Sequence, residues 1–509
     1  MTAAADLILY GGEVHTLGDE DEVYDAVAAR DGRVVGLAND YDAEFLEGTG
    51  TETVDLGGRV VIPGFVDAHT HMETVGQHGV HADLRGASGP EEVTERLAER
   101  ATETSGGEWV LGFGYDESQW GDGEDLAQAD LDAVSEARPV AAIREDMHTA
   151  TVNGVALAEY GDEMPDADVV GDGRIVEDAV EAVYDATDPG PAETKSLVAA
   201  AQREANERGV TAVHDMVRHS HAPRAYRELE AAGDLSVRVR VNYWADHLDA
   251  VLETGLVTNH GSGMVEMGAI KTYTDGSLGG HTAKLHEPYA DAPEETGTWV
   301  VDPEELADIV ERADDAGLQV TAHAIGDAAI DAVLDAYEDA AEDTGASRHR
   351  VEHAELASDD AIERMADLGV VASPQPNFLK WAGSDGLYED RLGTERRAAS
   401  NRYGDMLDAG VDVAFGSDCM PLDPLLGVHH AVNAPADGQR VSVTDALRAY
   451  TSGGAYAGFR EDEQGAIRSG ALADFTVLDA SPWEHADAIR EDVAVAMTVV
   501  DGDVVYDAR

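Results

Sequence analysis

Two histidines one residue apart, His69 and His71, follow an apolar run in the segment Val61–Met72, which reads VIPGFVDAHTHM. Side chains alternate between the two faces of a β-strand, so Asp67, His69 and His71 share one face if this run is a strand. Two imidazoles at the end of a strand can each offer one nitrogen to the same metal ion. Two ordinary loop histidines without a metal would give the same sequence pattern. The rest of the chain therefore has to decide between a metal site and a plain loop.

Four further residues of metal-binding type lie in or just after later apolar runs, namely Lys271, His323, His353 and Asp418. A single histidine or aspartate at the end of a strand is more often a structural residue. All six residues, however, fall at strand ends, which chance alone explains poorly. If the runs are parallel strands of a barrel, their carboxyl ends meet on the face where such barrels hold their active sites.

Lys271 is the most informative of these residues, because the chain has only four lysines and this one lies in an apolar strand between Ile270 and Thr272. Burial disfavours the ammonium form and lowers the pKa of a lysine. The neutral amine could then react with carbon dioxide to form a carbamate, a carboxylate-like group that can bridge two metal ions. The alternative interpretation is a buried lysine paired with an acidic side chain.

The elements that would carry these residues alternate along the middle of the chain, which predicts an α/β fold with a (β/α)8 TIM-type barrel. The strand candidates are Trp109–Phe113, Val140–Arg144, Val210–Asp215, Val237–Trp244, Gly268–Thr274, Leu318–His323, Arg350–His353, Val370–Ser373 and Val411–Ser417. The helix candidates are Pro90–Thr104, Ala192–Arg208, Pro303–Ala316, Asp327–Thr344, Asp359–Leu368, Thr394–Ala409 and Thr444–Thr451. These are more strands than a barrel needs, so part of residues 80–185 is expected to be an insertion after the first barrel strand.

Both ends of the chain instead consist of short strand-like runs joined by turns. Asp31-Gly32 and Asp501-Gly502, each between apolar runs, are typical of β-hairpins. We therefore expect residues 1–60 and 465–509 to form one small β-sandwich domain built from both termini. The metal-binding barrel would then occupy residues 61–464.

The charge of the chain limits its partners. Lysine and arginine number 34 against 103 aspartates and glutamates, a net charge of −69 that is spread along the whole sequence. This field repels nucleic acid and anionic membranes, so neither is expected as a partner. Molar salt shortens the Debye length to about 3 Å and removes most of the self-repulsion. We therefore expect a halophilic protein in the cytoplasm of a salt-loaded cell.

Hydropathy predicts a soluble intracellular protein, whereas the cysteine count does not indicate a redox compartment. Cys419 is the only cysteine, so no internal disulfide can form. No apolar run approaches the roughly 20 residues of a membrane span, and the first residues lack the basic and apolar regions of a signal peptide. Hydrophobic residues make up 43% of the chain, which is enough to build a sizeable core.

The motifs taken together resemble those of the metal-dependent amidohydrolase superfamily, in particular its amidohydrolase-3, YtcJ-like group. The resemblance covers essentially the full length. It rests on PGFVDAHTH (Pro63–His71), REDMHTATVN (Arg144–Asn153), KTYTDGSLGGHTAKL (Lys271–Leu285), AHAIGDAAI (Ala322–Ile330), RVEHAEL (Arg350–Leu356), GSDCMPLDPLLGV (Gly416–Val428) and the C-terminal GALADFTVLD (Gly470–Asp479).

The resemblance implies a role for each metal-type residue. His69 and His71 would bind a first metal, and Asp418 would bind the same metal and carry protons. Lys271, carbamylated, would bridge to a second metal held by His323 and His353. Two ions in such a site lie about 3.5–4 Å apart, and a divalent ion lowers the pKa of its bound water to about 7. The ligand set suits two Zn²⁺ ions, with iron, manganese and cobalt as alternatives.

Further residues are candidates for contacts with the substrate. Three of them match the R-x-D-x-H pattern of the YtcJ-like group: Arg144, Asp146 and His148. Others lie in loops after predicted barrel strands: Asp275, Ser277, His281, Asp327, Gln375 and Asn377. Asp327 could equally cap the helix that begins there. Apolar walls could come from Tyr115, Trp120 and Trp381.

The predicted function is a metal-dependent hydrolase that cleaves a non-peptide C–N bond of amide type in a small molecule. One alternative is a mononuclear deaminase of the same fold, with Lys271 unmodified. Another is an inactive homologue that serves as a binding protein. The sequence does not identify the substrate, and a homodimer is one assembly open to the chain.

Overall fold

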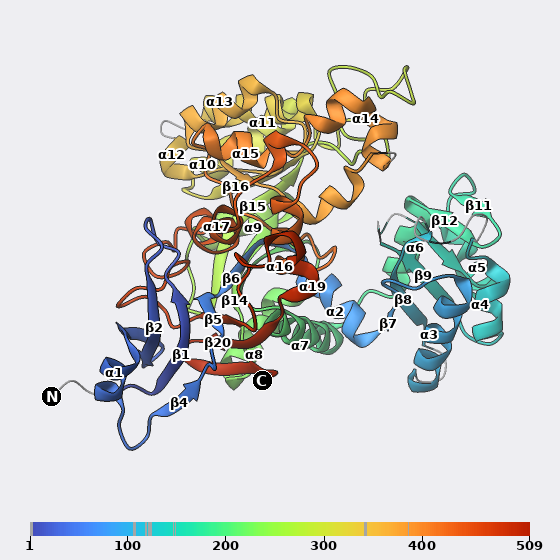
Figure 1. Ribbon diagram of the computed structural model, residues 1–509. Helices are drawn as coiled ribbons and strands as arrows, with labels where there is room; N and C mark the ends of the chain where they lie inside the picture. The colour runs from blue at the N-terminus through green and yellow to red at the C-terminus, as the bar shows by residue number, and fades with distance from the viewer. Residues whose placement is uncertain are drawn as a thin grey trace. The chain divides into compact units, whose positions relative to one another are not determined.

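The computed structural model in Figure 1 describes residues 4–104, 108–117, 120, 125–145, 147, 149–340, 344–384 and 386–509. Its internal contacts divide the chain into two compact units. One unit contains residues 1–71 and 205–509, and the other contains residues 72–204. The second unit includes the stretch 80–185 in which the sequence predicts an insertion.

The first unit is built around a parallel sheet of seven strands in the order β18-β17-β16-β15-β14-β13-β6. The strands are β6 (Phe65–Thr70), β13 (Val210–Val217), β14 (Arg238–Trp244), β15 (Val265–Tyr273), β16 (Gln319–Ala324), β17 (Arg350–His353) and β18 (Val371–Ser373). All six strand candidates between residues 210 and 373 are confirmed as members of this sheet.

The segment 411–418 lies between the two edge strands of this sheet. Ala372 of β18 forms a parallel bridge with Val413, and on the other side the Ala68 amide of β6 donates to the Phe415 carbonyl at 3.0 Å. The sheet is therefore nearly closed, and the predicted parallel barrel is confirmed at this level.

The apolar run at the start of the barrel is two strands rather than one. It divides at Gly64 into β5 (Val60–Pro63), which joins a different sheet, and β6. A Cβ atom at Gly64 would lie 2.2 Å from the Thr211 side chain, so only glycine permits this close passage between the sheets. The run that the sequence presents as a possible single strand is therefore two, and Asp67 and His69 lie in the second of them.

Most helices of the first unit follow barrel strands, as expected. The helix bounds are α1 (Asp40–Ala43), α8 (Ala222–Ala232), α9 (Leu248–Thr254), α10 (Pro303–Asp314), α11 (Asp327–Ala340), α12 (Thr344–Ser347), α13 (Asp359–Leu368), α14 (Leu387–Ala398), α15 (Tyr403–Asp408), α16 (Pro424–Val432), α17 (Val443–Arg448), α18 (Gly454–Ala457) and α19 (Ile489–Asp492). Helices α1 and α19 lie instead between strands of the sheet formed by the termini. Within the described part of the chain, no helix has the length and apolar character needed to cross a bilayer.

The predicted single helix Thr394–Ala409 is wrong. Helix α14 ends at Ala398 and α15 begins at Tyr403. Asn401 between them has φ of 53°, a left-handed conformation that interrupts a helix. The Asn401 amide donates instead to the Glu355 carbonyl at 2.7 Å, which ties this break to the loop after β17.

Strands from both termini share a second sheet of eight strands, in the order β21-β20-β19-β5-β1-β2-β3 with β4 paired to β1. The remaining bounds are β1 (Leu7–His15), β2 (Val23–Arg30), β3 (Arg33–Ala38), β4 (Glu52–Asp55), β19 (Phe475–Leu478), β20 (Val495–Val500) and β21 (Asp503–Asp507). Both predicted hairpins are confirmed. The eight strands belong to one hydrogen-bonded sheet, and the sandwich arrangement remains a prediction.

The second unit has its own sheet of six strands, in the order β11-β12-β10-β9-β8-β7. Its strands are β7 (Ala82–Asp83), β8 (Val110–Tyr115), β9 (Val140–Arg144), β10 (Thr149–Val152), β11 (Val169–Gly171) and β12 (Arg174–Val176). Its helices are α2 (Met72–Val80), α3 (Pro90–Glu103), α4 (Gln128–Val134), α5 (Gly154–Tyr160) and α6 (Asp178–Ala186), with α7 (Pro191–Glu207) leading into the first unit. The candidate strands near residues 110 and 140 therefore do not belong to the barrel.

Gly416 allows the segment 411–418 to approach β6 closely. A Cβ atom at Gly416 would lie 2.5 Å from the His69 nitrogen and 2.7 Å from its Cβ. Just after this glycine, the Ser417 and Asp418 amides both donate to the His69 carbonyl, at 3.1 and 2.7 Å.

We therefore predict that Gly416→Ala lowers the free energy of unfolding by about 1–3 kcal/mol, because an added methyl group overpacks this contact. Gly383→Ala is the matched control, since no atom lies within 4 Å of the added Cβ. Denaturant unfolding at constant salt measures both. Equal stability of the two variants would show that β6 and Gly416 do not approach in this way.

Candidate metal centre

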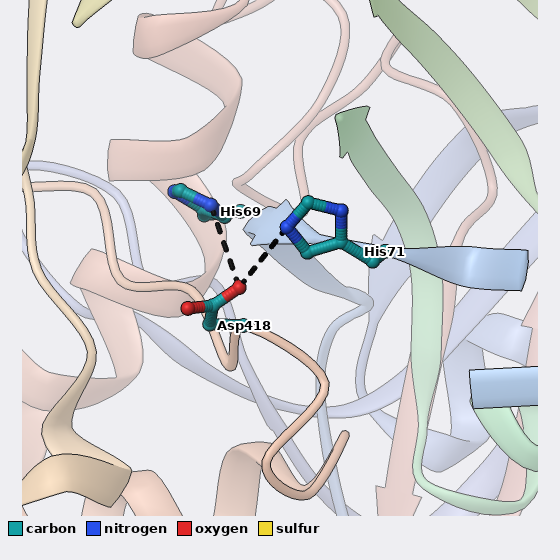
Figure 2. Close-up of side chains that lie close together, drawn as sticks. All are labelled: His69, His71 and Asp418. Carbon is teal, nitrogen blue, oxygen red and sulfur yellow. Dashed lines mark ion pairs between the residues drawn. The ribbon is translucent and has the colours of Figure 1, made fainter. Parts of the chain in front are cut away.

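Three of the predicted ligands come together at the carboxyl end of the barrel, as Figure 2 shows. His69 lies in β6, His71 directly follows it, and Asp418 follows the segment that closes the sheet. The Asp418 Oδ1 atom is 3.6 Å from His69 Nε2 and 3.3 Å from His71 Nε2. Among the described residues, this is the one group of three or more histidine, cysteine or acidic side chains whose ligand atoms all lie within 4.8 Å of one another.

In each histidine, the hydrogen bond made by Nδ1 determines whether Nε2, which faces Asp418, carries a proton or a lone pair. The Nδ1 atom of His71 is 3.1 Å from the Met216 carbonyl, which can only accept, so Nδ1 carries the proton. The Nδ1 atom of His69 is 2.5 Å from a Glu352 carboxylate oxygen. Burial lowers the pKa of His69 well below its ordinary value. Two Nε2 lone pairs and a carboxylate oxygen thus converge, an arrangement that a bound cation stabilises.

His353 and His323 continue this row of imidazoles. The ring centroids of His69 and His353 are 5.0 Å apart, and those of His353 and His323 are 4.5 Å apart. His323 Nε2 lies 3.1 Å from the Gly276 carbonyl, which places the proton on Nε2 and the lone pair on Nδ1. The Nδ1 atoms of His323 and His353 are both buried without a hydrogen-bond partner. Unpaired buried acceptors are costly, so these two rings fit a second metal.

Lys271 lies in β15 and is buried, as the sequence predicts. Its Nζ atom is 4.7 Å from the centroid of the Tyr273 ring and 5.5 Å from that of Trp244. Burial lowers the pKa of Lys271 to about 8, so an appreciable fraction is neutral amine near neutral pH. Among the described residues, no carboxylate oxygen lies within 4.0 Å of the Lys271 Nζ atom, the distance at which an ion pair would form. Carbamylation of Lys271 remains a prediction.

Two buried carboxylates near the ligands were missed as site residues. Glu352 contacts His69, and Asp67 accepts the amides of His69 and Ser417 at 3.1 and 3.0 Å. Burial raises the pKa of Asp67 to about 7. A signal was present for each, because both are acidic residues within predicted strands and next to, or separated by one residue from, a metal-type histidine. Their partners, however, lie far away in the sequence.

The predicted substrate residues of the second unit are only partly described. Arg144 ends β9, and its Nε donates to Glu117 at 2.8 Å. Asp146 and His148 lie outside the described residues. Tyr115 and Trp120 stack on each other, with ring centroids 5.7 Å apart. Their contact with a substrate therefore stays a prediction.

The loop after β15 is held by Asp275, which is fully buried. Its carboxylate accepts the amides of Lys284, Gly326 and Ile325 at 2.7, 2.8 and 3.1 Å. These bonds join the loops after β15 and β16, so Asp275 anchors the loops around His323. Its predicted contact with a substrate is not needed to explain its burial.

His281, Asp327 and Gln375 also have partners within the protein. His281 Nε2 is 3.0 Å from Asp291, and Asp327 at the start of α11 accepts the His286 amide at 2.9 Å. Gln375 donates to the Ser373 carbonyl at 2.7 Å. Its Oε1 atom is buried without a partner, which leaves Gln375 the best placed of these three to accept a hydrogen bond.

An aromatic group lies beside the second pair of histidines. Phe378 lies parallel to His353 with ring centroids 6.0 Å apart, and it contacts Trp381 at 5.0 Å. Trp381 was predicted as an apolar wall, whereas Phe378, which lies next to His353, was missed. Figure 2 leaves these rings out, but the distances place an apolar surface at one side of the metal-type residues.

Comparison with known proteins gives consistent results. A sequence model described as the amidohydrolase family matches residues 52–506. Putative amidohydrolase YtcJ of Bacillus subtilis is 31% identical over 98% of this chain and 99% of its own length. An N-substituted formamide deformylase of Arthrobacter pascens is 26% identical over 100% of this chain and 99% of its own.

Among solved structures, an uncharacterised metal-dependent hydrolase from Pyrococcus furiosus matches with a TM-score of 0.79 and 31% identity. The match covers 94% of this chain and 99% of that one. The likeness thus extends over both the barrel and the sheet formed by the termini. With the family model matching nearly the whole length, the chain belongs to the amidohydrolase family.

Proposed function

We propose that this protein is a metal-dependent hydrolase that cleaves a non-peptide C–N bond of amide type in a small molecule. The observation that carries the proposal is the convergence of His69, His71 and Asp418, with both histidines presenting Nε2 to one carboxylate oxygen. The relative named N-substituted formamide deformylase supports an amide-type substrate.

The residues present fit two divalent ions. His69, His71 and Asp418 would hold the first ion, and His323, His353 and carbamylated Lys271 would hold the second. Imidazole and carboxylate ligands suit Zn²⁺, with iron, manganese and cobalt as alternatives. Such ions, when bound, lower the pKa of water to about 7 and polarise the substrate carbonyl.

Asp418 is proposed to move the proton. Burial acts to raise its pKa, but the polar neighbours of Asp418, which are His69, His71 and Lys271, together hold the pKa below its ordinary value. The ionised carboxylate would accept a proton from the attacking water and then deliver it to the leaving amine. Removing the charge while keeping the shape of this side chain should therefore stop the reaction.

A mononuclear deaminase of the same fold is the second candidate. The observation that favours it is that only the first site is compact among the described residues, while the Lys271 ammonium faces two aromatic rings. Release of free ammonia from an amino-substituted heterocycle would support the deaminase. Release of a carboxylate and an amine from an N-acyl compound would support the hydrolase. An inactive homologue would be expected to have lost ligands, and the chain keeps all six.

We predict that Asp418→Asn lowers kcat by at least about 100-fold on N-formyl and N-acyl amines, since positioned acid–base groups contribute about 10²–10⁴. The assay uses a panel of such amines in molar KCl, with metal-loaded protein. The control is Asp437→Asn, whose side chain is 97% exposed. An Asp418→Asn enzyme as active as this control would contradict the proton role.

The charge of −69 further leads us to propose a salt-loaded cytoplasm as the setting of this protein. The melting temperature is predicted to rise as KCl increases from about 0.1 to 3 M, because the Debye length falls from about 10 Å to below 3 Å. Sucrose is the control, since it is excluded from protein surfaces without screening charge. A melting temperature that is independent of KCl, or that rises equally in sucrose, would exclude charge screening as the cause.

A further inference from the structure

Glu352 is a fully buried carboxylate in β17 that the proposed reaction does not use directly. One of its oxygens lies 2.5 Å from His69 Nδ1. The other oxygen is 2.8 Å from Arg350 Nη2 and accepts the Thr321 hydroxyl. The carboxylate is thus held from three sides, and the imidazole is the one of its three partners that belongs to the candidate metal centre.

Arg350 is itself fixed within the barrel. It is fully buried, and its Nη1 atom donates to His214 Nδ1 at 2.8 Å. Its Nη2 atom donates to the Ala68 carbonyl at 2.6 Å and to the Ser373 hydroxyl at 2.9 Å. The guanidinium is therefore anchored to three other strands, β13, β6 and β18. Its positive charge offsets the negative charge of Glu352.

A carboxylate can only accept hydrogen bonds, so the contact with Glu352 places the His69 proton on Nδ1 and leaves the lone pair on Nε2. An anionic partner also makes the imidazole more electron-rich and therefore a stronger ligand. His71 differs, because its Nδ1 faces the neutral Met216 carbonyl at 3.1 Å. Of the two histidines of the first site, His69 is therefore the one whose tautomer and ligand strength are set by a buried negative charge.

We propose that Glu352, held by Arg350 and Thr321, is a positioning residue that presets the tautomer and orientation of His69 for metal binding. The inference rests on the proposed function only in taking His69 as a metal ligand. It adds that the affinity of the first site depends on a buried hydrogen-bonded network, made by Arg350 and Glu352 of β17 and Thr321 of β16.

The test is the Zn²⁺ affinity of Glu352→Gln, measured by competition with a chromogenic chelator in molar KCl. Loss of such a partner is expected to weaken metal binding by about 10–100-fold. Binding of Co²⁺ gives a second readout, because its visible absorption reports the ligand set directly. We expect the Co²⁺ spectrum of the variant to differ from that of the unaltered protein.

Glu266→Gln is the matched control. Glu266 is also a buried glutamate at a barrel strand, in β15, but its partners are Arg460 and, at 3.7 Å, Arg240. Both variants lose one buried negative charge, and only Glu352 contacts a predicted ligand. Equal loss of Zn²⁺ affinity in both variants would overturn the proposal, as would unchanged affinity in Glu352→Gln.

Thr321→Val keeps the test decisive if Glu352→Gln does not fold. It removes one hydrogen bond to Glu352 without changing any charge, so a smaller loss of Zn²⁺ affinity in the same direction is expected. Wild-type affinity in a folded Thr321→Val protein would then count against the proposal. Failure of the unaltered protein to bind Zn²⁺ would instead overturn the proposed function, which separates the two failures.

Discussion

The candidate site depends on the contact between β6 and the segment 411–418, which nearly closes the barrel. Asp67 accepts amides from both sides of this contact, and the Ser417 and Asp418 amides both bond the His69 carbonyl. Gly416 has no Cβ atom, and a Cβ atom at this position would keep the two segments apart. This contact joins residues 350 positions apart in sequence, and it is what brings Asp418 beside the Nε2 atoms of His69 and His71.

Several charged side chains are buried in the interior of the barrel, among them Glu352, Arg350 and Lys271. Arg350 offsets Glu352, which in turn contacts His69. Lys271 lies beside two aromatic rings, and burial keeps its pKa low although the charges of Glu352 and Asp418 act to raise it. Four cationic side chains are buried among the described residues. Lys271 and Arg350 lie near the metal-type residues, whereas Arg238 and Arg240 face Asp474 and Glu266.

Much of this organisation could be predicted from the sequence. The alternation of strands and helices predicts the barrel, and the six metal-type residues stand out because each follows or interrupts an apolar run. Lys271 could be recognised for the same reason, since a charged residue in an apolar strand is rarely incidental. Local patterns were sufficient because these residues carry their chemistry in their own type and position.

Features that depend on distant parts of the chain could not be predicted in the same way. Glu352 acquires its meaning from His69, which is 283 positions away. The division of the first apolar run at Gly64 follows from contact with Thr211, and the helix break at Asn401 follows from its bond to the loop after β17. No periodicity in the local sequence contains these partners. The separate sheet of the second unit was likewise hidden, because its strands alternate with helices as barrel strands do.

The most direct test of the account is anomalous diffraction from crystals grown with Zn²⁺ in molar KCl. The account predicts one strong peak between His69, His71 and Asp418, and a second beside His323 and His353 with continuous density extending from Lys271 Nζ. A single peak with an unmodified lysine would retain the metal centre and exclude the two-metal form. The absence of any peak between His69, His71 and Asp418 would contradict the central claim.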